Sequence, residues 1–323
     1  MGFTIRNFSW DDVPFLVESF NRSAQADGDI YEFTAEELRS YLDSPDVNLE
    51  QDGLVAIADD GKRVAEADVE FEPEIGRGWA GCFVHPDYRG QGIGTALLRA
   101  TDARALERGQ RETPPEKPIY VQRAAISTAT SAVNLLTENG YERVRSFFIM
   151  QIELNEPAEA PAAPAGFDFR DFDPERDLEA AYTVQQAAFA DHWGFTPDSL
   201  ENWREYFLGV HNFDPSLWTL AWEGDQPAGI AICRPFSEKE ADLGWINIVA
   251  VRREYRKHGL GTALLHRSFE RLYRKGYRRA GLGVDAASPT NAVALYERAG
   301  MYVRLRRDVF RKVLRGAAGD IAF

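Results

Sequence analysis

The sequence contains the same segment twice, and this internal repeat constrains the fold more than any other feature. Residues Val84–Leu98 (VHPDYRGQGIGTALL) align without a gap with Val251–Leu265 (VRREYRKHGLGTALL). Two further pairs occur in the same order: Phe3–Phe8 with Phe167–Phe172, and Asn134–Tyr141 with Ala294–Met301. Three matched segments in one order predict that the chain is a duplication of one structural unit. Its 323 residues are enough for two domains of ordinary size.

The boundary between the two copies is expected in Asn155–Ala165. This stretch holds three prolines and has no apolar periodicity, which is typical of an extended linker. The sequence therefore predicts an N-terminal domain over residues 1–154, a linker over 155–165 and a C-terminal domain over 166–323.

Each copy has the pattern of an α/β domain. The order is strand, one or two helices, strand hairpin, apolar strand, glycine-rich turn, helix, strand, helix and strand. In the second copy the hairpin is predicted from Leu217–Trp222 and Ala228–Cys233, and the apolar strand from Trp245–Val251. The helix after the turn has an apolar inner face, formed by Leu264, Leu265, Phe269 and Leu272.

The glycine-rich turns, Arg89–Gly94 and Arg256–Gly261, are candidate anion sites. Glycine allows the backbone to approach a ligand closely, and the free N–H groups at the start of a helix favour an anion such as a pyrophosphate. The alternative is an ordinary strand-to-helix turn without a ligand. Neither turn has the Gly-Lys-Ser/Thr ending of a P-loop or the third spaced glycine of a dinucleotide fingerprint, which disfavours nucleoside triphosphates and nicotinamide cofactors.

The pattern Val-x-x-x-Tyr-Arg-x-x-Gly-x-Gly-Thr-Ala-Leu-Leu, followed by Asn291–Gly300, resembles the GNAT superfamily of N-acetyltransferases. The tandem copies, together with Phe213–Trp218, are similar to the mycothiol synthase group. The resemblance covers nearly the whole chain, twice. It implies two tandem acetyl-CoA-binding α/β domains, each a mixed, mostly antiparallel sheet with splayed central strands flanked by helices.

The resemblance also implies which residues bind acetyl-CoA. The turn would hold the pyrophosphate, and main-chain groups of the preceding strand would hold the pantetheine arm and the thioester. In the second copy the expected residues are Val249, Val251, Arg256, Lys257, His258, Gly259, Leu260, Gly261, Thr262 and Asn291. In the first copy they are Val84, Arg89, Gly90, Gln91, Gly92, Ile93, Gly94 and Thr95. Asn291 has an alternative role in capping the helix that follows it.

Tyr296 falls where these enzymes keep a tyrosine that protonates the departing coenzyme A thiolate. A phenol suits this role because it is a donor with a high ordinary pKa. The alternative is a partly buried aromatic residue without a chemical role. The first copy has Leu136 at the matching position and Ser131 where the second has Asn291. We therefore expect chemistry in the C-terminal domain and a catalytically degenerate N-terminal domain that binds acetyl-CoA without turnover or serves as a scaffold.

The general base is harder to assign. The mycothiol synthase group has a glutamate on the strand before the cofactor turn, whereas this chain has Trp245 there. The remaining candidates are Glu240, Asp242, Asp191 and His192, and release of the proton to water is a further alternative.

The acceptor pocket is expected between two segments, 191–195 and 235–245. Acidic residues there would attract a protonated amine and aromatic residues would form an apolar wall; the alternative is that the aromatic residues are core and the acids face solvent. The residues assigned to this pocket are Asp191, His192, Trp193, Asp242 and Trp245.

Composition narrows the function further. A formal charge of −14 disfavours non-specific nucleic-acid binding and suits a cationic amine. No apolar run reaches membrane-spanning length and no secretory signal is recognisable, so a cytoplasmic protein is expected. The five histidines show no metal-ligand spacing, and no metal is expected.

The leading expectation is an N-acetyltransferase that moves acetyl from acetyl-CoA to a primary amine of a small molecule by direct attack. The alternatives are a protein or peptide N-acetyltransferase and a non-catalytic acyl-CoA sensor. The acceptor, the acyl-chain preference and the oligomeric state stay open.

Overall fold

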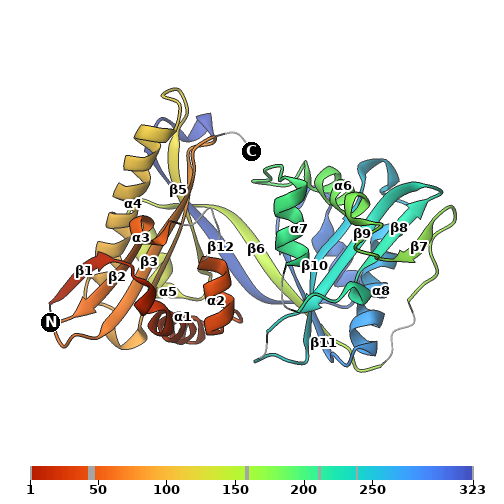
Figure 1. The fold of residues 1–323 in the computed structure, drawn as a ribbon, viewed down its shortest axis with the longest axis horizontal. Helices are drawn as coiled ribbons and strands as arrows, with labels where there is room; N and C mark the ends of the chain where they lie inside the picture. Colours follow the sequence, from red (N-terminus) through yellow and green to blue (C-terminus); the bar gives the residue numbers. More distant parts are fainter. Residues whose placement is uncertain (1, 43–47, 157–159, 210–211, 238, 322–323) are drawn as a thin grey trace. The chain divides into compact units, whose positions relative to one another are not determined.

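The computed structural model describes residues 2–42, 48–156, 160–209, 212–237 and 239–321. They form two compact units (Figure 1). Unit 1 contains the described residues up to Ser146 together with those from Leu305 onward, and unit 2 contains Phe147–Arg304. Among the described residues, no helix combines the length and the apolar character needed to cross a membrane.

Unit 1 is a six-stranded mixed sheet with helices. In spatial order its strands are β1 (Phe3–Asn7), β2 (Gly53–Ala58), β3 (Arg63–Glu72), β4 (Arg77–Val84), β5 (Ile119–Ile126) and β12 (Tyr302–Arg315). Neighbouring strands are antiparallel except β4 and β5, which are parallel. The helices are α1 (Val13–Asp27), α2 (Ala35–Leu42), α3 (Leu49–Asp52), α4 (Ile93–Glu112) and α5 (Thr130–Glu138).

Unit 2 repeats this arrangement. In spatial order its strands are β7 (Asp168–Asp171), β8 (Thr219–Glu223), β9 (Gln226–Pro235), β10 (Leu243–Val251), β11 (Arg279–Asp285) and β6 (Glu142–Glu153). Only the pair β10 and β11 is parallel among the strand pairs described for this unit. The helices are α6 (Leu178–Phe189), α7 (Leu200–Leu208), α8 (Leu260–Arg274) and α9 (Ala292–Arg298). The predicted α/β class, the hairpin and the mostly antiparallel sheets are confirmed.

The units differ from the expected domain boundaries at their last strands. β6, which the repeat assigns to the first copy, pairs with β11 in unit 2. β12, which the repeat assigns to the second copy, pairs with β5 in unit 1, where Figure 1 shows the blue β12 beside the yellow β5. Each sheet therefore receives its sixth strand from the other repeat. A boundary drawn from the repeat misses this exchange because strand pairing depends on long-range hydrogen bonds.

In unit 2, α6 and α8 cover opposite faces of the sheet. Successive side chains of a strand point to opposite faces, so alternate residues of β9 meet different helices. Ile230 and Ile232 pack in one cluster with α6, whereas Ala231, and a Cβ placed on Gly229, meet Leu260 and Leu264 in the first turns of α8. The four predicted inner-face residues of α8 are all buried, which confirms that face: Leu264, Leu265, Phe269 and Leu272.

Candidate active site

The two central strands of unit 2 separate after a short parallel pairing. β10 and β11 pair at Leu243–Trp245 with Arg279–Gly281. Beyond these pairs, β10 continues beside β9 and β11 continues beside β6. The splayed strands implied by the resemblance are therefore present, with an opening between Ile246 and Leu282.

β10 contains a β-bulge at this opening. The register of β10 against β9 shifts between Ile246 and Ile248, which leaves Asn247 as an extra residue. In unit 1 the matching strand β4 pairs with β3 in continuous register and is one residue shorter. The buried Oδ1 atom of Asn247 has no hydrogen-bond partner among the described residues. The bulge was not predicted, but its signal is in the sequence: aligning the two copies backward from Val84 and Val251 reveals one extra residue in the second copy.

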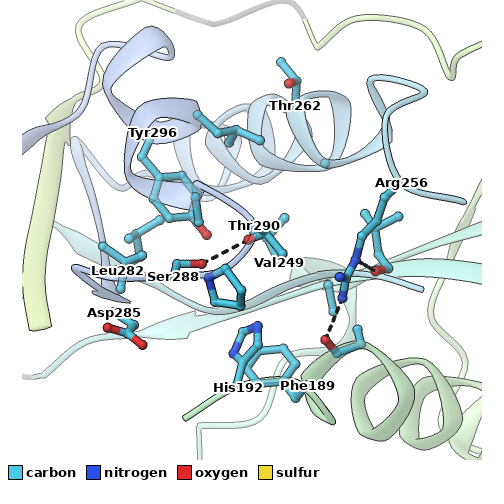
Figure 2. A pocket seen from close by; sticks show the side chains of 18 of the residues that line it. Phe189, His192, Val249, Arg256, Thr262, Leu282, Asp285, Ser288, Thr290 and Tyr296 are labelled. Carbon is cyan, nitrogen blue, oxygen red and sulfur yellow. Dashed lines mark hydrogen bonds between the residues drawn. The ribbon is translucent and has the colours of Figure 1, made fainter. Parts of the chain in front are cut away.

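A cavity of about 860 Å³ passes through the opening. Figure 2 shows it between the splayed strands, α6 and α9. Its lining joins the glycine-rich turn, the ends of both strands and the loop after β11. The lining residues include Phe147, Phe189, His192, Trp193, Asn247, Arg253, Lys257, Gly259, Thr262, Leu282, Asp285, Tyr296 and Arg298.

The turn at the start of α8 has the geometry of an anion site. Gly259 is left-handed, with φ of 79°, and the first hydrogen bond of the helix runs from Ala263 N to Gly259 O. The N–H groups of Leu260, Gly261 and Thr262 therefore have no acceptor within the helix. A Cβ placed on Gly259 would meet no described atom within 4 Å. Open space in front of free N–H groups can receive a phosphate.

Cationic side chains also line the cavity. Lys257 belongs to the turn, Arg253 lies three residues before it, and Arg298 is the last residue of α9. Lys257 has a positive φ of 71°, and unit 1 has Gly90 at this position with φ of 75°. The two turns therefore have the same backbone conformation, while the second adds a charge.

The side chain of Arg256, the first residue of the turn, makes hydrogen bonds to neighbouring elements. Its Nη1 donates to Asp191 Oδ2 at 3.0 Å, and its Nη2 donates to Ala188 O at 3.0 Å. Its Nε donates to Val251 O at 3.2 Å. Arg256 thus joins the end of β10 to the last turn of α6 and to Asp191 just after it, and its hydrogen bonds lower the pKa of Asp191.

Tyr296 reaches the opening from α9. The side chain is 9% exposed, and burial raises the pKa of its phenol to about 12. In Figure 2 its hydroxyl points into the cavity. The residue is therefore both a packed aromatic and a proton donor facing the cavity.

His192 and Trp193 line the cavity from the residues after α6. The imidazole of His192 packs against Phe189, with ring centroids 4.2 Å apart, and Trp193 lies 6.0 Å from the ring of Phe147. Burial lowers the pKa of His192. The imidazole is therefore neutral near pH 7 and able to accept a proton.

Comparison with known proteins shows the family to which the chain belongs. The acetyltransferase (GNAT) family model matches residues 178–301, and a GNAT domain model matches residues 50–143. A mycothiol acetyltransferase from Thermobispora bispora is 33% identical over 70% of this chain and 72% of its own length. One from Catenulispora acidiphila is 31% identical, over 70% and 69% respectively. The chain belongs to the GNAT family of acetyltransferases.

Solved structures show the same tandem architecture. A GCN5-related N-acetyltransferase from Sphaerobacter thermophilus has a TM-score of 0.82 at 33% identity, over 98% of this chain and 96% of that one. A tandem GNAT protein from the clavulanic acid biosynthesis pathway has a TM-score of 0.75 at 16% identity, over 98% and 100%, which supports the fold. This GNAT protein is thus an acyltransferase with two family domains.

The structure does not bring every predicted site residue of this GNAT protein to the cavity. Asp191 and Asp242 are not among its lining residues, and each is bound by an arginine: Arg256 for Asp191, and Arg279 for Asp242, where Arg279 Nε donates to Asp242 Oδ2 at 2.9 Å. Trp245 is 6% exposed and packs against Phe236, with ring centroids 4.9 Å apart. The expected attraction of an amine by Asp191 and Asp242 therefore finds no support in their positions.

Of the cofactor residues expected in the second copy, two also lie outside the lining. Asn291 is exposed at the N-cap of α9 with φ of 55°, and its side chain makes no capping hydrogen bond there. His258 lies near the ring of Phe167, with centroids 6.0 Å apart. By contrast, Asp285 at the end of β11 lines the cavity and was not predicted. A carboxylate directly after an apolar strand, before Ser288-Pro289, was the available signal.

Unit 1 has the same arrangement of strands and turn, but different side chains at the opening between its central strands. Arg89 bonds Asp27 at 2.7 Å and Val84 O at 3.2 Å, as Arg256 does with its counterparts. Leu136, which matches Tyr296, is buried in the core. Arg123 takes the place of Leu282, and its Nη1 lies 3.5 Å from Gly81 O across the opening between β5 and β4.

A buried polar network holds Arg123 in this place. Its Nη2 donates to Asp102 at 3.0 Å and its Nε donates to the Tyr141 hydroxyl at 2.8 Å. The matching residues of unit 2, Phe269 and Met301, are apolar core residues. The opening in unit 1 is thus bridged by charged groups, whereas that in unit 2 is lined by apolar ones.

Proposed function

We propose that unit 2 transfers acetyl from acetyl-CoA to a primary amine of a small molecule by direct attack, without a covalent enzyme intermediate. One observation carries this proposal: a single cavity connects the anion-binding turn of α8 to the Tyr296 hydroxyl through the opening between β10 and β11. A long substrate with phosphates at one end and a reactive group at the other fits this layout.

Acetyl-CoA matches both ends of the cavity. Its phosphates suit the free N–H groups of residues 260–262 and the cations Arg253, Lys257 and Arg298. Main-chain groups near Val249 and Val251 would hold the pantetheine arm. The thioester supplies the activated acetyl group when the molecule is bound. Of the expected residues, Val249, Val251, Arg256, Lys257, Gly259, Leu260, Gly261 and Thr262 line the cavity.

Tyr296 is the proposed proton donor to the departing thiolate. A phenol with a pKa of about 12 keeps its proton at neutral pH. The thiolate would form in the same buried surroundings, which raise its own affinity for a proton. Attack by the amine and donation by Tyr296 then complete the transfer.

The acceptor site is proposed on the α6 side of the opening, beside His192 and Trp193. The relatives named mycothiol acetyltransferase support a small-molecule amine as acceptor. A protein or peptide acceptor is the second candidate within the same chemistry. A non-catalytic acyl-CoA sensor is disfavoured by Tyr296, which presents its hydroxyl to the cavity.

An amine panel tests this function. The protein is mixed with acetyl-CoA and desacetylmycothiol, glucosamine, spermidine or a short peptide, and release of the coenzyme A thiol is followed. We expect turnover with a small-molecule amine. Turnover with the peptide alone would favour the second candidate, and acetyl-CoA binding without turnover of any amine would favour the sensor.

A further inference from the structure

Direct attack requires a group that takes the proton of the amine. Asp285 lines the cavity, and its Oδ1 accepts from Ala287 N at 3.0 Å. Of the four candidates from the sequence, all of which the structure describes, Asp191 is bound by Arg256 and Asp242 by Arg279. Glu240 accepts from Arg279 and Arg304, both at 2.8 Å. Burial opposes ionisation of Glu240, but the hydrogen bonds from these arginines lower its pKa. A carboxylate with a lowered pKa is a weak proton acceptor.

His192 is the fourth candidate, and it lines the cavity. Its neighbour Asp191 is held by Arg256, the N of His192 donates to Phe189 O at 2.8 Å, and its O accepts from Phe195 N at 3.2 Å. The ring packs on Phe189, which fixes its plane. It comes from the α6 face of the sheet, whereas α9 packs beside α8 on the other face through Leu295 and Gly261. His192 and Tyr296 therefore approach the opening from opposite faces (Figure 2).

The two copies of the repeat differ at both of these positions. In each unit an arginine of the turn binds an aspartate at the end of the first long helix: Asp27, the last residue of α1, in unit 1, and Asp191, two residues after α6, in unit 2. The residue that follows is Gly28 in unit 1 and His192 in unit 2. Unit 1 also has Leu136 in place of Tyr296. The imidazole and the phenol are thus present together in unit 2 and absent together from the matched positions of unit 1.

We propose that His192 is the general base that removes the proton of the acceptor amine. This assignment rests on the proposed function. The amine nitrogen forms a bond to the acetyl carbon, the C–S bond breaks, the amine proton moves to the free ring nitrogen of His192, and the Tyr296 proton moves to the thiolate. The imidazolium then loses its proton to solvent and the Tyr296 phenolate regains one.

The charges around His192 set its pH dependence. Burial lowers its pKa and Arg256 acts in the same direction, while Asp191 and Asp285 oppose them. Arg298 and Tyr296 line the same cavity. Because the neutral imidazole is the active form, activity should fall as the pH drops through the pKa of His192, which lies below its ordinary value of 6.5. Above that pKa the fraction of neutral His192 no longer changes, and the ionisation of the acceptor amine sets the remaining pH dependence.

His192→Gln tests the proposal with whichever amine of the panel is turned over. We expect kcat/KM for that amine to fall about 10²- to 10⁴-fold at pH 7.5 and the acidic limb of the pH profile to disappear. Acetyl-CoA binding, measured by calorimetry, should change little. His266→Gln on α8, outside the lining of the cavity, is the matched control and should keep both the rate and the limb.

A second variant separates chemistry from packing. His192→Gly reproduces the residue of unit 1, and added imidazole should restore part of its rate if the ring accepts the proton. Activity within about twofold of wild type in His192→Gln, or an unchanged acidic limb, would overturn the proposal. An NMR pH titration of the His192 ring in the wild-type protein gives a readout that needs no acceptor amine. A His192 ring that is protonated at pH 7.5 would also overturn the proposal. Failure of the wild type to acetylate any amine would instead count against the proposed function itself.

Discussion

Replacing Tyr296 by phenylalanine should lower kcat by about ten- to ten-thousand-fold while acetyl-CoA binding stays nearly intact. Phenylalanine keeps the ring that packs in the core of unit 2 and removes only the hydroxyl that faces the cavity. The proton donor is needed while the thiolate departs. Its loss therefore weakens stabilisation of the transition state and lowers kcat, without changing the affinity for acetyl-CoA. Single-turnover release of the thiol, with acetyl-CoA affinity measured separately, distinguishes this from a binding defect.

Two controls make the assignment of Tyr296 specific. Leu136→Val alters the matching position of unit 1, which has no hydroxyl, and should have a far smaller effect on kcat. Tyr273→Phe removes a hydroxyl from α8 outside the lining of the cavity and should also leave kcat nearly unchanged. Equal turnover of wild type and Tyr296→Phe, under conditions where chemistry limits the rate, would refute a role for Tyr296 as acid.

Gly259→Glu should abolish acetyl-CoA binding to unit 2. The open space in front of Gly259 would receive a carboxylate, which repels phosphate and covers the N–H groups at the start of α8. The backbone there has φ of 79°, so glutamate also strains the turn. Calorimetry with acetyl-CoA measures the result, and circular dichroism checks that the variant is folded.

The matched change in unit 1 is Gly92→Glu, at φ of 83°. If both turns bind acetyl-CoA, the wild type has two sites and each variant keeps one. We expect the site of unit 1 to be weaker because Arg123 bridges its opening. Loss of all binding in Gly259→Glu would show that unit 1 is an empty scaffold.

The sequence by itself determined the duplication, the order of elements and the placement of the glycine-rich turns. These are local properties: apolar periodicity fixes a helix or a strand, and a glycine before a helix fixes its N-terminus. The position of Tyr296 was also readable from the sequence, through the resemblance of Asn291–Gly300 to the GNAT superfamily. Its hydroxyl does face the cavity in unit 2.

Only the tertiary structure decided which strands complete each sheet and which charged groups are engaged. β6 and β12 exchange between the repeats because each strand pairs with a distant partner. Asp191 meets an arginine 65 residues away and Asp242 one 37 residues away. The state of a carboxylate depends on such neighbours and on burial, neither of which is local in sequence. For the same reason the sequence alone left four candidates for the general base. Of these, only His192 lines the cavity, and arginines bind the other three.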